Sequence, residues 1–261
     1  MKKLTLAVLV VTLACFSCER YEDYTIDYQY SAVYFASQKP LRTVVAREPM
    51  QFKFGVAIGG LRANKQGHWA EYKIDTTLLS TVPGADQFEL LPESYYSLSD
   101  ESRFEIPKGE VIGDVTLTLD MESFTSDPRA HLNTYALPLK ITDASLDSIL
   151  RGGEGVDSLD YSVIVVKYMS RYAGAYYHKG VERQLDDQGE VIYESVFRDK
   201  DLSKNRVLET TTIGADTILT NGMGNDRGGG LQLAINDDHS VDIQYEGSTA
   251  TFESGSGTYD P

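Results

Sequence analysis

The chemically versatile residues of this chain lack the spacing that a reaction centre needs. The histidines form no H-E-x-x-H or similar ligand pattern. They are His68, His131, His178 and His239. Asp186-Asp187 and Asp237-Asp238 lack the rhythm of a calcium loop and occur where a hairpin turn favours Asp. The glycine-rich stretch 222–230 has no following Lys-Ser/Thr to make a phosphate loop. We therefore predict no catalytic residue, no metal and no cofactor.

The two cysteines have possible chemistry, and both lie near the N-terminus. Cys15 and Cys18 follow the charged start Met1-Lys2-Lys3 and an apolar run over 4–16, which is too short to span a bilayer. Cys18 comes directly after a small residue, so we predict a lipoprotein signal peptide over 1–17 and lipidation of Cys18, the chain's only membrane attachment. Cys15 is the competing acceptor, and ordinary secretion with a free Cys18 thiol is the alternative.

Composition excludes several classes of partner and favours strands. After removal of the leader, 22 basic and 39 acidic residues leave a net charge of −17, which repels nucleic acid and anionic lipid. The mature chain has no cysteine pair for an internal disulfide, so its stability must come from buried apolar area. With 17 Tyr, 9 Phe and 22 Gly against 5 Met, the chain is predicted to be all-β.

We predict a flexible tether over 18–30. The strands that would position any site follow it. Period-two alternation is clearest at 51–58, where Phe52, Phe54, Val56 and Ile58 share one face. Similar strands are expected near 32–36, 69–74, 95–98, 103–106, 115–119 and 135–141. The continuous apolar run 162–168 predicts a strand covered on both sides. We predict an immunoglobulin-like β-sandwich over 31–169.

From residue 170 the pattern changes to longer strands, tighter hairpins and more glycine. The stretches 172–185 and 190–197 are expected to pair across a hairpin loop at 186–189. Further strands are expected at 207–213, 216–219, 231–235, 241–245 and 249–253. We predict a C-terminal antiparallel β-barrel or sandwich domain over 170–261.

Several motifs, in order, resemble a lipoprotein domain of Bacteroidetes, which is also found in front of family-18 endo-β-N-acetylglucosaminidases. The motifs are Val33-Tyr34-Phe35, Phe52-Lys53-Phe54, Gly59-Gly60, Leu90-Leu91-Pro92-Glu93-Ser94-Tyr95-Tyr96, Ile106-Pro107-Lys108-Gly109 and Tyr135-Ala136-Leu137-Pro138-Leu139. The stretch 172–180 resembles the opening of a C-terminal β domain of unknown function that accompanies it. Acidic residues after Cys18 resemble the export tags of surface lipoproteins.

The resemblance implies a lipid-anchored protein of the outer membrane, facing the cell exterior, in a polysaccharide-utilisation system. Expected partners are a polysaccharide or oligosaccharide and components of a starch-utilisation-type importer. Family members continue past the final Tyr259-Asp260-Pro261 into an aromatic strand. We therefore expect a C-terminal domain that lacks its last strand, so that the strand at 249–253 has an unpaired edge.

Aromatic side chains are the remaining candidates for a binding site. The apolar face of a sugar ring packs on Trp or Tyr, while its hydroxyls bind polar groups at the rim. Trp69 is predicted on the polar side of its strand, one of Tyr176 and Tyr177 must face outward, and Tyr193 lies on the facing hairpin strand. We predict a non-catalytic glycan-binding protein, because about ninety residues after the first domain cannot form a glycosidase barrel. The alternative is a structural or adhesive spacer that binds a protein.

Overall fold

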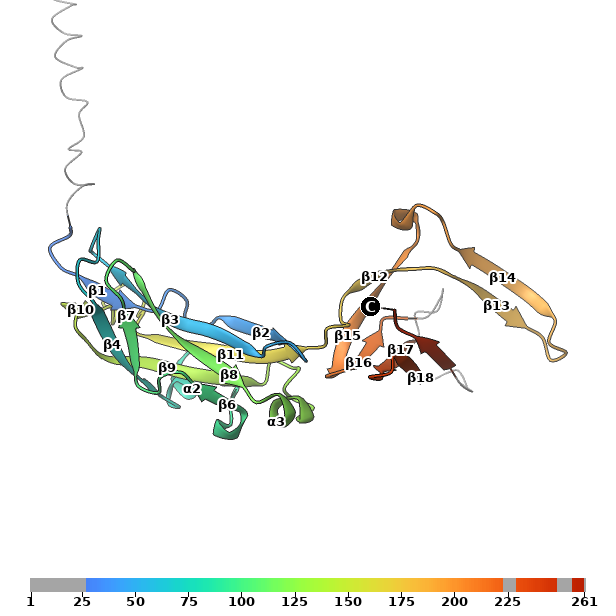
Figure 1. Cartoon of the computed structure of the whole chain (residues 1–261), viewed down its shortest axis with the longest axis horizontal. Helices are drawn as coiled ribbons and strands as arrows, with labels where there is room; N and C mark the ends of the chain where they lie inside the picture. Colours follow the sequence, from blue (N-terminus) through green and yellow to red (C-terminus); the bar gives the residue numbers. More distant parts are fainter. Residues whose placement is uncertain (1–26, 223–228, 248–254, 261) are drawn as a thin grey trace, which may run out of the picture.

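The structure, a computed structural model, describes residues 27–222, 229–247 and 255–260. Figure 1 shows two groups of strands arranged end to end. Among the described residues, short helical segments occur in the first group and in one loop of the second. The all-β prediction is confirmed. The predicted signal peptide, Cys15, Cys18 and the strand expected at 249–253 lie outside the described residues.

The first group is a sandwich of two mainly antiparallel sheets. One sheet has the order β10 (Ser148–Ile149), β1 (Ala32–Tyr34), β3 (Gln51–Gly59), β8 (Ile112–Leu119) and β6 (Tyr96–Leu98). The other has the order β2 (Leu41–Val45), β11 (Tyr161–Met169), β9 (Tyr135–Ala144), β4 (His68–Ile74) and β7 (Arg103–Ile106), with β5 (Glu89–Leu90) also paired to β9. Short helices α2 (Leu78–Thr81), η2 (Glu93–Tyr95) and α3 (Met121–Ser126) connect the strands.

The core between these sheets comes from the alternation of the strands. Phe54 of β3 meets Tyr72 and Phe104 edge to face, at centroid distances of 6.1 and 5.8 Å. Strand β11 is covered on both sides, as its apolar run predicts. Its Ile164 and Val166 enter the main core, while Val163 and Val165 pack under Leu78 of α2.

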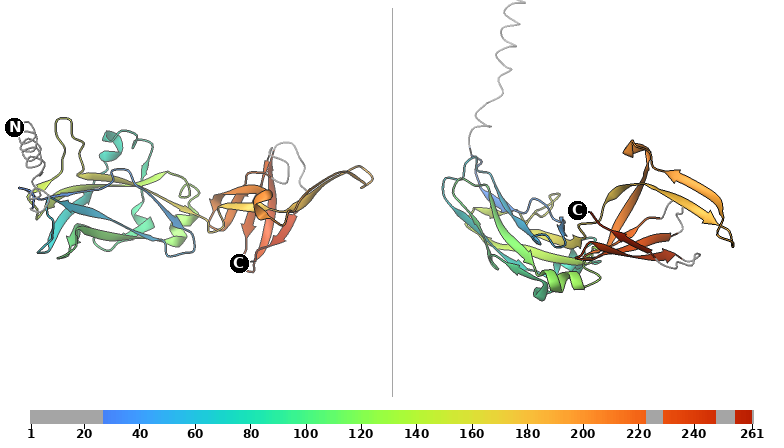
Figure 2. Two further views of the ribbon diagram at one scale, coloured as in Figure 1. Left: turned by 90° about the horizontal axis from the view of Figure 1, so that it is seen from above. Right: turned by 45° about the vertical axis from the view of Figure 1, so that its right-hand side comes forward.

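The second group contains one curled sheet and a separate hairpin. The sheet has the order β12 (Ala175–His178), β15 (Arg206–Gly214), β16 (Thr217–Thr220), β17 (Gly229–Ile235), β18 (Ser240–Gly247) and β19 (Gly255–Thr258). The hairpin of β13 (Gly180–Leu185) and β14 (Val191–Phe197) projects beyond this sheet (Figure 2), and η3 (Leu202–Lys204) follows it.

The two edges of the curled sheet approach each other at one end. The ring of Tyr172, just before β12, meets the ring of Tyr259, just after β19, at a centroid distance of 5.0 Å. Strand β19 was not predicted, since its sequence Gly-Ser-Gly-Thr reads as a loop. It pairs with β18 and covers the edge of that strand.

Few polar contacts join the two groups. Arg47, in the turn between β2 and β3, has a left-handed φ of 68° and forms a bidentate ion pair with Asp216, with N···O distances of 2.9 and 2.7 Å. Asp237 lies 3.5 Å from the same guanidinium. The backbone N–H of Ser170 donates to the hydroxyl of Thr212 at 2.9 Å. The turn between β15 and β16 is thus held against the end of the sandwich.

Candidate functional site

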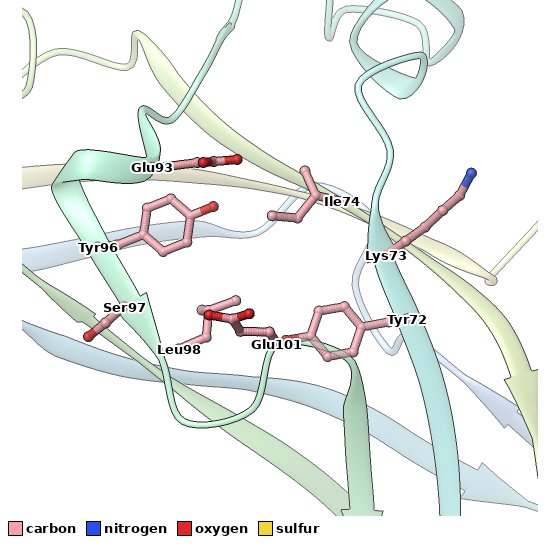
Figure 3. Close-up of a pocket in the computed structure, with 8 residues that line it drawn as sticks. All are labelled: Tyr72, Lys73, Ile74, Glu93, Tyr96, Ser97, Leu98 and Glu101. Carbon is pink, nitrogen blue, oxygen red and sulfur yellow. The ribbon is translucent and has the colours of Figure 1, made fainter.

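A cleft between β4 and β6 has the composition of a ligand site. It encloses about 480 Å³, within the range of roughly 300–1,000 Å³ usual for small-molecule pockets. We call it the Tyr96 cleft. Its lining residues are Tyr72, Lys73, Ile74, Glu93, Tyr96, Ser97, Leu98 and Glu101 (Figure 3).

Three local features of the sequence build this cleft. Pro92 precedes the single turn η2, which places Glu93 above the ring of Tyr96 at the start of β6. The other wall is the end of β4, where Tyr72 is buried and Ile74 is half-buried. The loop after β6 carries Glu101 across to the ring of Tyr72 (Figure 3).

The walls of the cleft differ in rigidity. The Tyr72 hydroxyl donates to the backbone carbonyl of Asp100 at 2.5 Å, and the Tyr72 ring stacks on Phe104 at a centroid distance of 4.5 Å. Burial raises the pKa of Tyr72, and the nearby charges of Asp100 and then Glu101 raise it further. Tyr72 is therefore a fixed wall, while Tyr96 is half-buried and presents its ring and hydroxyl to the cleft.

Three polar groups of the cleft are free to bind a ligand. Within the described part of the chain, the carboxylates of Glu93 and Glu101 and the hydroxyl of Tyr96 have no hydrogen-bond or ion-pair partner. Burial raises the pKa of Tyr96, and the charges of Glu93 and Glu101 raise it further. Apolar surface with unpaired polar groups at its rim suits a molecule with both C–H faces and hydroxyls.

A second concavity lies on the inner face of the curled sheet. It encloses about 330 Å³ and is mainly aliphatic, with aromatic rings from Tyr172, Tyr176 and Tyr259 at its margin. The Tyr176 hydroxyl donates to the carbonyl of Tyr172 at 2.7 Å. Few polar groups line this groove, so it fits the hydroxyls of a sugar less well than the Tyr96 cleft does.

The structure does not bring the four predicted aromatic residues together. Trp69 of β4 is half-buried, and the Arg103 guanidinium lies over its ring at 4.6 Å. Tyr176 and Tyr177, about half exposed, pair with neighbouring residues of β15 and so lie on opposite faces of the sheet. Tyr193, also about half exposed, lies on β14 in the separate hairpin. Their individual roles in glycan binding remain predictions.

Sequence reasoning missed the Tyr96 cleft, although its signal was present. The segment 90–96 was used only as one motif of the family resemblance, and it contains both Glu93 and Tyr96. Their approach to Tyr72 and Ile74 depends on β4 and β6 lying in different sheets of the sandwich, which no local pattern encodes.

The described residues contain no group of three or more His, Cys, Asp or Glu side chains able to hold a metal ion. Among the same residues, no helix is both long and apolar enough to cross a membrane. His131 and His178 each have a buried Nδ1 without a partner, and burial lowers the pKa of both imidazoles.

Comparisons with known proteins bear mainly on the fold. A protein-family model described as a "-like, N-terminal domain" matches residues 26–148. No curated protein matches this chain. A solved structure of a Bacteroides ovatus protein of unknown function is 23% identical, with a TM-score of 0.76, and the match covers 89% of this chain and 82% of that one. This similarity supports the all-β architecture.

Two further Bacteroides ovatus structures are more distant. One is a multidomain protein including DUF1735, 13% identical with a TM-score of 0.46, and the match covers 83% of this chain and 71% of that one. The other is a protein of unknown function, 12% identical with a TM-score of 0.43 and the same coverage. At these TM-scores they carry no argument about this chain.

Proposed function

We propose that this protein is a non-catalytic, lipid-anchored surface protein that binds extracellular glycan and passes it to an outer-membrane importer. One observation carries the binding proposal. The Tyr96 cleft combines an accessible aromatic ring with unpaired hydrogen-bonding groups on Glu93, Glu101 and Tyr96 itself. A sugar ring presents its C–H face to such a ring and its hydroxyls to such acceptors.

The sequence supports two further parts of this proposal, the lipid anchor and the location of the protein. Cys18 is the expected lipidated residue, and the acidic residues after it favour export to the outer face of the outer membrane. Trp69, Tyr176, Tyr177 and Tyr193 remain candidate contacts for parts of a long glycan outside the cleft. Mass spectrometry of the N-terminal peptide from native membranes tests the anchor, since an unmodified Cys18 would contradict it.

Calorimetry against a panel of neutral polysaccharides tests the binding proposal. We expect Tyr96→Ala to weaken binding about fivefold, because a stacked aromatic contact contributes on the order of 1 kcal/mol. Tyr28→Ala is the matched control, because Tyr28 is 72% exposed and lies outside the cleft. Trp69→Ala and Tyr177→Ala measure any contribution from the other candidates.

Two results would contradict the proposal. Wild-type protein that binds no glycan in the panel would remove its basis. Glycan binding unaffected by Tyr96→Ala would place the site elsewhere, with Trp69, Tyr176, Tyr177 and Tyr193 as the next positions to test.

A second function, binding a protein partner as a spacer or adhesive subunit, is favoured by the projecting hairpin. Leu185, Val191, Ile192 and Val196 of β13 and β14 are each at least half exposed. An isolated two-stranded ribbon buries little of its own apolar surface, and such surface is typical of protein interfaces. Failure to bind glycan, together with loss of a membrane-protein partner in Ile192→Ser, would favour this function.

A further inference from the structure

The Tyr96 cleft has an unbalanced charge. Glu93 and Glu101 are exposed carboxylates, and neither pairs with a cation among the described residues. Lys73 is the one basic residue that lines the cleft, but its ammonium lies 3.2 Å from Asp75. In Figure 3 the Lys73 chain points away from both glutamates. The cleft therefore carries two uncompensated negative charges.

The two glutamates flank one aromatic ring. Figure 3 shows Glu93 on one side of Tyr96 and Glu101 on the other, toward Tyr72, with Ile74 and Leu98 as the apolar surface between the walls. Both negative charges help raise the pKa of Tyr96, after the larger effect of its burial. A ligand whose ring rests on Tyr96 would thus meet both carboxylates.

This arrangement favours one class of ligand over others. Ionised carboxylates only accept hydrogen bonds, so they favour a ligand group rich in donors. An ammonium group supplies three donors and a positive charge, and hydrogen bonds between ionised groups are roughly twice as strong as neutral ones. A carboxylated or sulfated sugar would be repelled here, and the formal net charge of −15 adds to that repulsion.

We propose that the Tyr96 cleft selects glycans that carry free amino groups, with ammonium groups held by Glu93 on one side of Tyr96 and by Glu101 on the other, and a sugar ring packed on Tyr96. This inference rests on the proposed function and specifies its ligand.

The test compares three oligosaccharides of equal length by calorimetry with the mature full-length protein. They are a glucosamine oligomer with free amines, its fully N-acetylated counterpart and a galacturonic acid oligomer. We expect the amine-bearing oligomer to bind at least tenfold more tightly than the N-acetylated one, and the acidic oligomer not to bind.

Charge-matched variants assign the selectivity to the cleft. Glu93→Gln combined with Glu101→Gln is expected to remove the preference for free amines. The control combines Glu110→Gln with Glu154→Gln, which removes two exposed negative charges outside the cleft and keeps the preference. All four side chains are exposed, so these variants are expected to fold, which thermal melting checks.

The outcomes separate this inference from the proposed function. Equal affinity for the amine-bearing and N-acetylated oligomers, or a preference that survives in the Glu93 and Glu101 double variant, overturns the amine selectivity. The proposed function then stands, because glycan still binds. Absence of binding to these oligomers and to neutral polysaccharides overturns both.

Discussion

Asp127, at the end of α3, shows how one carboxylate organises a buried corner of the sandwich. It accepts hydrogen bonds from the hydroxyls of Tyr135 and Tyr95 and from the backbone N–H of Arg129. Burial opposes ionisation of Asp127, but these hydrogen bonds outweigh it and lower its pKa to about 2. The charged form is therefore the one that the folded protein stabilises.

We predict that Asp127→Asn lowers the free energy of unfolding by about 1–3 kcal/mol at pH 7, because the amide cannot match the charged hydrogen bonds. The pKa is lower in the folded state, so this stabilisation is present above about pH 4 and is lost as the pH falls toward 2. Urea unfolding across this range checks the prediction. Asp86→Asn is the control, since its exposed carboxylate has no bond to protein in the described structure. Equal destabilisation by both variants would contradict it.

At the scale of elements, glycine allows strands of the two sheets to approach closely. Gly113 of β8 is buried, and a Cβ there would lie 2.6 Å from the backbone oxygen of Glu105 in β7. It would also lie 2.6 Å from Cγ1 of Ile106. The backbone oxygen has little freedom to move, so a side chain at this position forces the sheets apart.

We predict that Gly113→Ala destabilises the protein by about 1–3 kcal/mol, the usual cost of overpacking a core. Gly153→Ala is the control, because a Cβ at Gly153 meets no atom within 4 Å. It should change stability by less than about 0.5 kcal/mol. Chemical denaturation measures both, and a Gly113→Ala variant as stable as the control would show that the strands adjust.

Most strands of the sandwich could be predicted from the alternation of apolar and polar residues. Which strand pairs with which could not. The face of β3 that carries Phe54, Val56 and Ile58 is buried as predicted. Helix α2 follows Asp75, whose carboxylate accepts a hydrogen bond from the Thr77 hydroxyl just ahead of the helix. The alternation of apolar residues indicates which face of a strand is buried, but the pairing of strands depends on contacts between distant segments.

Pro138 lies in an interior strand, although the missing N–H of proline is better tolerated at the edge of a sheet or at a bulge. Strand β9 lies between β11 and β4. The pairing of β4 with β9 ends at Ile74 and Leu139, so the missing N–H of Pro138 falls just beyond the ladder. There the N–H of Asp75 still donates to the Pro138 carbonyl at 2.9 Å. An interior strand tolerates proline where a neighbour's pairing ends.

The candidate site was less predictable than the fold. An exposed aromatic residue can be expected from alternation, but a cleft needs two segments whose distance only the tertiary structure sets. Tyr72 and Tyr96 are separated by α2, β5 and η2 and lie in different sheets. The sequence therefore pointed to aromatic chemistry in general and not to this cleft.

At the scale of the whole molecule, the ion pair of Arg47 with Asp216 restrains how the two groups of strands sit together. The pair is partly exposed, so its energy is only about 0–1 kcal/mol. Its effect is on orientation, because few other polar contacts join the groups in the described structure.

We predict that Asp216→Asn broadens the range of orientations without changing the melting of either group. Spin labels on cysteines introduced at Thr118 of β8 and Gln244 of β18 report the distance distribution, since both residues are exposed on strands. Asp237→Asn is the control, because its carboxylate is 91% exposed and lies farther from Arg47. A distribution equally narrow in both variants would assign the restraint to packing of Ala215 against the core.

Strands β1 and β10 of the first group and the hairpin of β13 and β14 lie at opposite ends of the molecule (Figure 1). Asp27 is fixed to the first group, where its carboxylate accepts the backbone N–H of Arg62 at 2.7 Å. In the lipid-anchored protein that we propose, the hairpin lies at the end of the molecule away from β1 and β10, the end nearer the anchor. Extracellular proteases would then reach its turn at 186–189 readily.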